Sequence, residues 1–234
     1  DMDTPPSVPA VARAGAGVNN IPVAELSRRG VPVFNAPGAN ANAVKEIVIG
    51  SLFIAARNLM PAWDYVRNLD GTDETIHKQV EAAKKQFVGF ELPTRTLGVV
   101  GLGAIGVQAA NSALALGMNV IGYDPQITVQ RAWQMSSAVQ QAINLDDLCS
   151  RSHMITIHVP LNDGTRNLIN RERIALMPRG SVLLNFARDG VVDVDAVIEA
   201  LDSGKLACYV TDFPTVRLKA HPKAVCLPHL GAST

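Results

Sequence analysis

Short apolar runs separated by longer, mixed stretches dominate the chain from Thr96 onward. Six such runs can be recognised: TLGVV (96–100), NVIGY (119–123), MITIHV (154–159), SVLLNF (181–186), CYVTDF (208–213) and AVCLP (224–228). Helix-length segments fill the intervals between them. Strands that alternate with helices predict βαβ units, and therefore a parallel sheet covered by helices on both faces. The expected fold class is α/β, with a doubly wound, Rossmann-like parallel sheet.

The chain before Thr96 has a different pattern. As far as Pro37 it consists of short β-like runs broken by turns. Asn40 or Asn42 is then a suitable N-cap for a helix over 41–60, which should end before Pro61. Residues 62–93 are more polar, and the stretch 74–87 fits an exposed helix.

Composition and charge exclude several classes of function. The chain has 234 residues, of which 47% are hydrophobic, and its 21 Lys and Arg residues balance 21 Asp and Glu residues. No net field therefore favours nucleic acid or an anionic membrane as a partner. The longest apolar stretch, 47–56, is too short to span a bilayer, and we do not expect the first residues to form a signal peptide, since they have neither a basic start nor an apolar core. Three widely spaced cysteines without a CxxC pair suit reduced thiols in the cytoplasm rather than disulfides or a metal site.

A glycine signature lies between the first two apolar runs. Gly101, Gly103 and Gly106 form GxGxxG directly after a predicted strand and at the start of a predicted helix. The next strand ends at Asp124, 18 positions beyond Gly106, which is close to the spacing of the acid that binds the adenosine ribose hydroxyls. A glycine-rich turn without a ligand is the alternative, but this context favours dinucleotide binding. An acid at this position disfavours a 2′-phosphate, so NAD is preferred to NADP.

Two charged or titratable residues stand at other predicted strand ends, where ligands collect in open α/β sheets. Arg188 follows SVLLNFA, and His229 follows AVCLP. The alternatives are a surface arginine and a loop histidine that caps a following helix. Beside a nicotinamide site, however, a guanidinium for a carboxylate and a proton-exchanging imidazole are what hydride transfer from a 2-hydroxy acid requires. His158 is better interpreted as a structural residue.

Several longer stretches make a family resemblance specific. ARAGAGVNN (12–20), FNAPGANANAVKE (34–46), TLGVVGLGAIG (96–106), NFARDGVVD (185–193) and PHLGAST (228–234) resemble the D-isomer-specific 2-hydroxyacid dehydrogenase family, and within it the phosphoglycerate-oxidising branch. These stretches are spread over nearly the whole chain. The resemblance implies a Rossmann-like domain combined with a flavodoxin-like substrate domain, of which this chain would hold only part.

The same resemblance implies roles for individual residues. Arg188 would hold the substrate carboxylate, and His229 would be the acid/base. Substrate contacts would also come from Arg13, Gly17 and Val18, with Arg13 near the substrate phosphate. The cofactor pocket would consist of Ala16, Gly101, Gly103, Ala104, Ile105, Gly106, Asp124, Val159, Pro160, Phe186, Ala187, Arg188, Asp212, His229, Gly231 and Ala232.

The chain departs from the family pattern in two respects. The resemblance predicts more chain at both ends, so we expect residues 1–40 to be a remnant of the substrate-binding domain. Residues 41–228 would then be the NAD-binding domain with its linking helix, and 229–234 the start of the return. The family's catalytic glutamate is expected 29 positions after Arg188, where this chain has Arg217. We therefore expect Arg217 near His229, and stronger cofactor binding than substrate turnover from these 234 residues.

These features together predict NAD-dependent oxidation of D-3-phosphoglycerate to 3-phosphohydroxypyruvate, the entry step to serine. A glyoxylate or hydroxypyruvate reductase, or another D-2-hydroxyacid dehydrogenase, is the alternative within the family. An NAD-sensing binding protein on the same scaffold is the alternative of another class. The expected partner is a small 2-hydroxy acid, and residues 41–60 and 62–86 are candidates for a homodimer interface.

Overall fold

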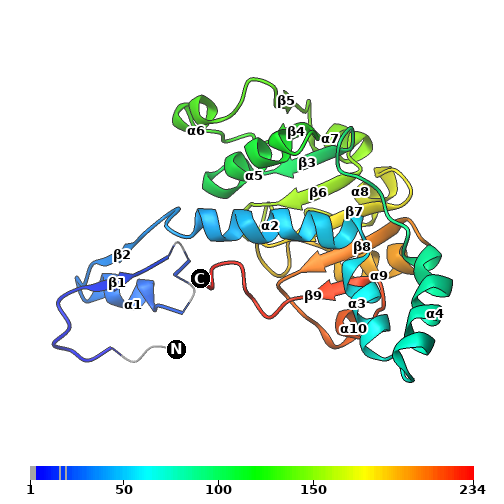
Figure 1. Ribbon diagram of the computed structural model, residues 1–234. Helices are drawn as coiled ribbons and strands as arrows, with labels where there is room; N and C mark the ends of the chain where they lie inside the picture. Colours follow the sequence, from blue (N-terminus) through cyan, green and yellow to red (C-terminus); the bar gives the residue numbers. More distant parts are fainter. Residues whose placement is uncertain (1–3, 16, 19) are drawn as a thin grey trace.

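The computed structural model describes residues 4–15, 17, 18 and 20–234. Within them, seven parallel strands form one sheet in the order β5-β4-β3-β6-β7-β8-β9 (Figure 1). The strands are β3 (Thr96–Val100), β4 (Asn119–Tyr123), β5 (Gln140–Gln141), β6 (Met154–Ile157), β7 (Ser181–Asn185), β8 (Leu206–Thr211) and β9 (Ala224–Cys226). The order reverses between β3 and β6, as expected for a doubly wound sheet. The predicted fold class is confirmed.

Helices cover both faces of this sheet. On one face lie α2 (Ala41–Ala56) and α5 (Ala104–Ala115), and on the other α7 (Leu145–Arg151), α8 (Arg171–Leu176) and α9 (Val194–Asp202). The short helices α6 (Val129–Gln134) and α10 (Val216–Lys219) lie in the connections. Side chains of β7 alternate between the two cores, since Val182 and Leu184 pack with α2 and α5 while Leu183 packs with α9.

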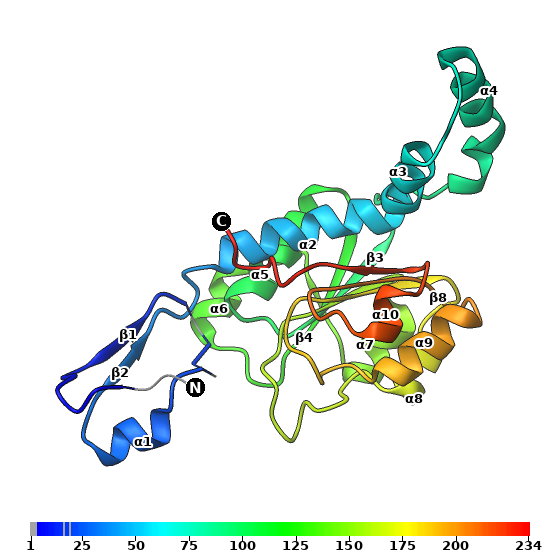
Figure 2. The same ribbon diagram turned by 90° about the horizontal axis from the view of Figure 1, so that it is seen from below.

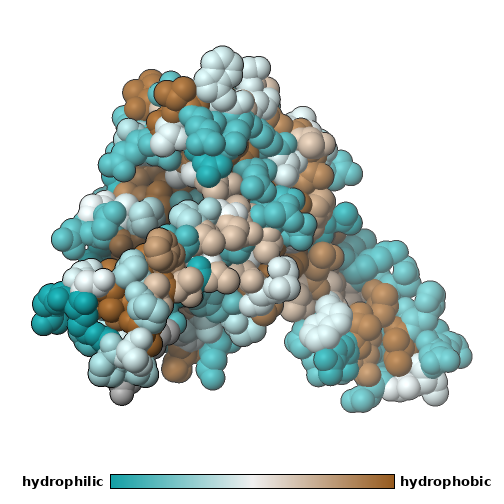
Figure 3. Space-filling model, turned by 90° about the vertical axis from the view of Figure 1, so that its left-hand side faces the viewer, coloured by the Kyte–Doolittle hydropathy of each residue, from teal (hydrophilic) through white to brown (hydrophobic). Residues whose placement is uncertain are grey.

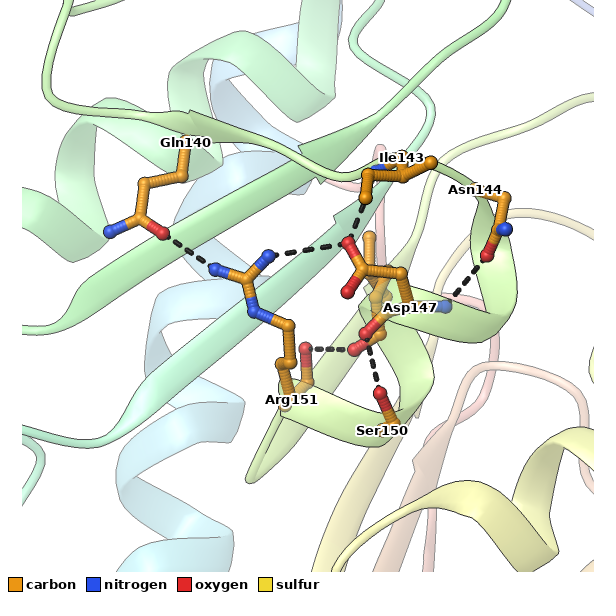
Figure 4. Close-up of polar contacts among 8 residues, drawn as sticks. Gln140, Ile143, Asn144, Asp147, Ser150 and Arg151 are labelled. Atoms are coloured by element: carbon orange, nitrogen blue, oxygen red, sulfur yellow. Dashed lines mark hydrogen bonds and ion pairs between the residues drawn. The ribbon is translucent and has the colours of Figure 1, made fainter.

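The edge strand β5 was not expected, because Gln140 and Gln141 carry no apolar signal. Figure 4 shows how side chains join it to α7. Asn144 caps α7 by accepting a hydrogen bond from the Asp147 amide at 2.8 Å. Arg151 donates to the Asp147 carboxylate at 3.2 Å and to the Gln140 side chain at 2.7 Å. Polar bonds therefore hold an edge that the hydrophobic pattern does not mark.

The helix expected over 41–60 is divided in two. Helix α2 ends at Ala56, Asn58 adopts a left-handed conformation with φ of 50°, and α3 (Leu59–Arg67) begins directly after it. The expected stop at Pro61 is therefore wrong. Proline is the third residue of α3, within the first turn, where a missing N–H costs no helical hydrogen bond. The N-cap of α2 is Asn40, although its side chain makes no capping bond.

A helical arm continues from α3 through α4 (Asp73–Ala83) and the 3-10 turn η1 (Lys84–Phe87), and matches the exposed helix expected over 74–87. Figure 2 shows the arm projecting from the end of α2, away from the sheet. Apolar side chains gather on it at the lower right of Figure 3. Leu59, Trp63 and Val66 of α3 are 46%, 53% and 50% exposed, so the arm presents an apolar surface.

The first residues form a separate small unit. Strands β1 (Val11–Arg13) and β2 (Val33–Asn35) pair in parallel, and α1 (Val23–Arg28) connects them. Ile21, Leu26 and Val31 form its core. The unit lies beyond the start of α2, on the side to which the strands of the large sheet point (Figure 1). No helix in the described part of the chain is long and apolar enough to cross a membrane.

Candidate active site

The glycine loop has the geometry of a phosphate cradle. Gly101 has φ of +90°, and a Cβ there would lie 2.8 Å from the His158 carbonyl oxygen. A Cβ on Gly106 would lie 1.9 Å from the Gly101 carbonyl oxygen, so only glycine allows α5 to start so close to β3. At Gly103, by contrast, nothing lies within 4 Å of the added atom. The space beside Gly103 faces the first N–H groups of α5, which favour an anion such as a pyrophosphate.

Asp124 directly follows β4 beside this loop, and its carboxylate bonds two backbone amides, a role that the sequence did not indicate. Its Oδ2 accepts a hydrogen bond from the Leu102 amide at 2.8 Å, and its Oδ1 accepts one from the Gln126 amide at 2.8 Å. The carboxylate therefore fixes the glycine loop as well as offering further lone pairs to ribose hydroxyls. It borders two cavities, of about 440 and 380 Å³. The smaller one is also lined by Gly103, Ala104, Ile105 and Arg131.

The end of β7 presents Arg188 through a polar turn. Asn185 is buried, and its side chain accepts from the Ala187 amide and donates to the Arg188 carbonyl oxygen, both at 3.1 Å. Phe186 and Ala187 are buried within this turn. The half-buried guanidinium of Arg188 donates to the Ala187 carbonyl oxygen at 2.6 Å, which leaves most of its N–H groups for another acceptor.

Of the residues expected from the amino-terminal unit, Gly17 lies close to the Arg188 guanidinium. A Cβ on Gly17 would lie 3.1 Å from Nη2 of Arg188, so the glycine lets the two segments approach. Arg13 instead donates to the side chain of Asn20 within its own loop, and Val18 packs against the small core of the unit. The structure thus brings Gly17 to Arg188, while Arg13 and Val18 contact their own unit. Ala16 lies outside the described residues.

His229 lies in a turn that follows β9. It has φ of 56°, a left-handed conformation that is uncommon for residues other than glycine. The buried Asp212 carboxylate, at the end of β8, accepts hydrogen bonds from the Leu230 amide at 3.1 Å and the Gly231 amide at 2.7 Å. The ring of Phe213 meets the imidazole edge-on, with centroids 5.3 Å apart. Two adjacent residues of the connection after β8 therefore hold the histidine turn, while Ala232 is exposed.

His158, at the end of β6, fits the structural role expected for it. Its Nε2 lies 3.0 Å from the hydroxyl of the buried Thr156, and burial lowers the pKa of the imidazole to about 4. Val159 and Pro160 follow it, half-buried and exposed respectively. A neutral imidazole at this depth packs behind the glycine loop rather than exchanging protons at neutral pH.

The sequence of residues 56–231 matches the family model described as "D-isomer specific 2-hydroxyacid dehydrogenase, NAD binding domain". The chain belongs to this family. NAD is therefore its cofactor, in agreement with the open glycine loop and with Asp124. This match confirms the predicted resemblance and the predicted cofactor.

Relatives within the dehydrogenase family differ in name and length. The chain is 40% identical over 230 residues to D-3-phosphoglycerate dehydrogenase of Methanocaldococcus jannaschii, an alignment covering 96% of this chain and 41% of that protein. It is 36% identical to hydroxypyruvate reductase of Thermotoga maritima, with 96% and 71% covered. Among solved structures, holo D-mandelate dehydrogenase of Rhodotorula graminis aligns with a TM-score of 0.84 and 28% identity, over 98% of this chain and 67% of that one. The chain spans about two fifths of the length of the phosphoglycerate dehydrogenase.

Phe213, and not the expected Arg217, is the observed neighbour of the His229 imidazole. Arg217 lies on α10, and its guanidinium pairs with Asp195 of α9 at the surface. The expectation that Arg217 stands near the imidazole is therefore wrong. A spacing of 29 residues counts positions along the chain, but the short helix α10 turns this side chain toward α9. Phe213, four residues earlier, contacts the imidazole instead.

Three residues with direct structural roles at the site were missed in the sequence. Asn185 shapes the Arg188 turn, Phe213 contacts the His229 ring, and Arg131 lines the cavity beside Asp124. A polar side chain at the end of an otherwise apolar strand was an available signal for Asn185. No sequence signal marks Arg131, which reaches the cavity only because α6 folds back after β4.

Proposed function

We propose that the full-length protein oxidises D-3-phosphoglycerate at C2 to 3-phosphohydroxypyruvate with NAD, as the entry step to serine. The observation that carries this proposal is the arrangement at one edge of the sheet. An NAD-type glycine loop, the half-buried Arg188 and His229 follow β3, β7 and β9 respectively, at the carboxyl edge of the same parallel sheet. Phosphoglycerate dehydrogenases at 35% to 40% identity support the choice of substrate.

The chemistry assigns each group one task. Arg188 has the planar donors that pair with a carboxylate, and thereby orients C2 of the substrate. The His229 imidazole accepts the proton of the C2 hydroxyl as the carbonyl forms. Bound NAD supplies the acceptor for the hydride that leaves C2. The open space beside Gly103 and the first N–H groups of α5 hold the cofactor's phosphates.

Steady-state assays of the full-length protein test this assignment. We expect the highest kcat/KM for D-3-phosphoglycerate among a panel of D-2-hydroxy acids, and a loss of about a hundredfold or more in kcat for His229→Ala with little change in NAD affinity. Equal turnover of unphosphorylated glycerate would contradict the proposed substrate. Full activity of His229→Ala would contradict the proposed role of the imidazole.

Hydroxypyruvate reduction is a second candidate, because the Thermotoga maritima relative of that name is covered over 71% of its length. The same site serves the reverse direction, with His229 giving its proton to the carbonyl oxygen. A higher kcat/KM for hydroxypyruvate with NADH than for 3-phosphohydroxypyruvate would favour it. NAD binding without turnover of any 2-hydroxy acid would favour an NAD-sensing binding protein.

We also propose a domain division and an assembly. Residues 1–40 would belong to the substrate-binding domain, 41–228 to the NAD-binding domain, and 229–234 to the return toward the former. The apolar side chains exposed on the arm support a homodimer interface that includes α3. A cytoplasmic location is supported by the free thiols of Cys149, Cys208 and Cys226, since unpaired cysteines suit a reducing compartment.

A further inference from the structure

The side chain that faces His229 belongs to the connection after β8. The centroid of the Phe213 ring lies 5.3 Å from that of the imidazole, with the two planes at 72°. This edge-on arrangement is a favoured geometry for aromatic pairs. The Phe213 backbone is itself fixed, because its amide donates to the hydroxyl of the buried Thr211 at 3.1 Å.

The backbone of the histidine is fixed from the same connection. The Asp212 carboxylate holds the Leu230 and Gly231 amides, and a Cβ on Gly231 would lie 3.0 Å from Oδ2 of Asp212. The loop after β8 thus carries two adjacent contacts to the histidine turn. Asp212 accepts hydrogen bonds from the backbone of that turn, and Phe213 contacts the imidazole ring.

Each charged group near this edge has a hydrogen-bond partner other than His229. Both oxygens of Asp212 accept from backbone amides, and Arg188 donates to the Ala187 carbonyl oxygen. Arg217 pairs with Asp195, and Asp189 accepts from the Gly190 amide. Within the described part of the chain, the ring contact of His229 is the one made by Phe213.

We propose that Phe213 is a positioning residue for the His229 acid/base, and that its ring orients the imidazole where other enzymes use a hydrogen-bonded carboxylate. The inference rests on the proposed function for its kinetic consequence, and on the ring contact for its geometry. The proposed role of Phe213 is exerted through the histidine alone.

Three substitutions of Phe213 in the full-length protein test the proposal. Phe213→Leu keeps an apolar side chain but removes the ring, and we expect kcat to fall about tenfold with the Kd for NAD within twofold of the wild type, since a misplaced acid/base slows the reaction without affecting cofactor binding. Phe213→Tyr restores the ring and should recover most of that loss. Unchanged kcat in Phe213→Leu, or equal losses in the Leu and Tyr variants, would overturn the proposal.

Phe213→Glu supplies a readout that a merely structural role would not move. A carboxylate at this distance favours the protonated imidazole, so the acidic limb of the oxidation profile should move about one pH unit or more toward higher pH. The control is Arg217→Glu on α10, which changes the charge by two units instead of one and should nevertheless leave the limb in place. A shift in the Arg217 variant but not in the Phe213 variant would overturn the proposal.

An NMR titration of the His229 imidazole separates this proposal from the proposed function. Its titration midpoint should move to higher pH in Phe213→Glu and stay in place in Arg217→Glu, whichever 2-hydroxy acid the protein oxidises. A protein that turns over no 2-hydroxy acid but shows this shift would refute the proposed function and retain the contact. An unmoved midpoint in Phe213→Glu would refute the contact itself.

Discussion

The Asp124 carboxylate combines two tasks at one position. It fixes the glycine loop through the Leu102 amide, and it stands where an adenosine ribose would be held. The cavity beside it also contains Arg131, whose guanidinium donates to the Gln134 side chain at 2.8 Å. Because Arg131 lines the same cavity, we attribute the preference for NAD to the Asp124 carboxylate and not to the absence of a cation.

We therefore predict that the wild type binds NAD at least tenfold more tightly than NADP, about 1.4 kcal/mol, and that Asp124→Ala reduces this ratio. The substitution removes a charge of the same sign as the phosphate and leaves Arg131 free to pair with it. Calorimetry with both cofactors measures the ratio. The control is Asp124→Ala combined with Arg131→Ala, which should lose the gain in NADP affinity. Equal affinities in the wild type would contradict the selection by Asp124.

His158 gives the fold a dependence on pH. Burial lowers the pKa of its imidazole to about 4, below the value of about 6.5 in the unfolded chain. The unfolded state therefore binds the proton more readily, and stability falls as the pH drops from about 6.5 toward 4.

We predict that His158→Gln reduces the loss of unfolding free energy between pH 7 and pH 4.5, by up to about 3 kcal/mol. Denaturant unfolding at the two pH values measures it. His77 is exposed on α4, so His77→Gln should retain the wild-type dependence. The same pH dependence in all three proteins would exclude His158 as its source.

The residues of the site were predictable to the extent that strand ends reveal them. Arg188, His229 and Asp124 follow apolar runs, and parallel strands bring their carboxyl ends to one edge. The sequence does not show in which direction each side chain points. The positions of Arg217 and Phe213 differ by four residues, and only the path of the chain after β8 decides which one meets the imidazole.

At the scale of elements, two glycines near the start of α5 have different roles, one in packing and the other in cofactor binding. Gly106 lies against the Gly101 carbonyl oxygen, whereas the space beside Gly103 is open. We predict that Gly106→Ala lowers the unfolding free energy by about 2 kcal/mol or more, because the added methyl group displaces backbone. Gly103→Ala should keep a melting temperature close to that of the wild type but weaken NAD binding at least tenfold, since its methyl group enters the phosphate space.

Thermal unfolding and calorimetry on the two variants measure these effects side by side. Each variant is the control for the other, because both add one methyl group to the same loop. Similar melting temperatures for both would mean that α5 can shift away from β3. Unchanged NAD affinity in Gly103→Ala would mean that the phosphates lie elsewhere.

The elements themselves were predictable where a repeated pattern covers several residues. The six apolar runs correspond to β3, β4, β6, β7, β8 and β9. The division between α2 and α3 was not, because it depends on the left-handed Asn58, whose side chain donates to the Val88 carbonyl oxygen at 3.2 Å. That hydrogen bond joins the two ends of the arm, which lie 30 residues apart in the sequence, so a local sequence pattern cannot predict it.

At the scale of the whole molecule, the arm exposes several large apolar side chains of α3, among them Leu59, Trp63 and Val66. We predict that Val66→Glu, on the exposed side of α3, converts a homodimer of the full-length protein to monomers, because a buried charge in an apolar interface is costly. Sedimentation velocity measures the mass. The control is Glu74→Gln on α4, at a position paired only with Lys78, which should leave the assembly unchanged. A wild type that is monomeric at micromolar concentration would refute the proposed interface.

The order of strands in the large sheet also determines how late the site can form during folding. No two neighbouring strands are joined by a hairpin, and the central pairing brings Leu97 beside Met154. Such non-local pairings are slow to close, because chain entropy must be lost before they contribute. The last strand ends at Cys226, and the bonds from Asp212 to the turn after it depend on that strand being in place. A chain emerging from the ribosome can therefore complete its nucleotide loop long before His229, the proposed acid/base, is held in place.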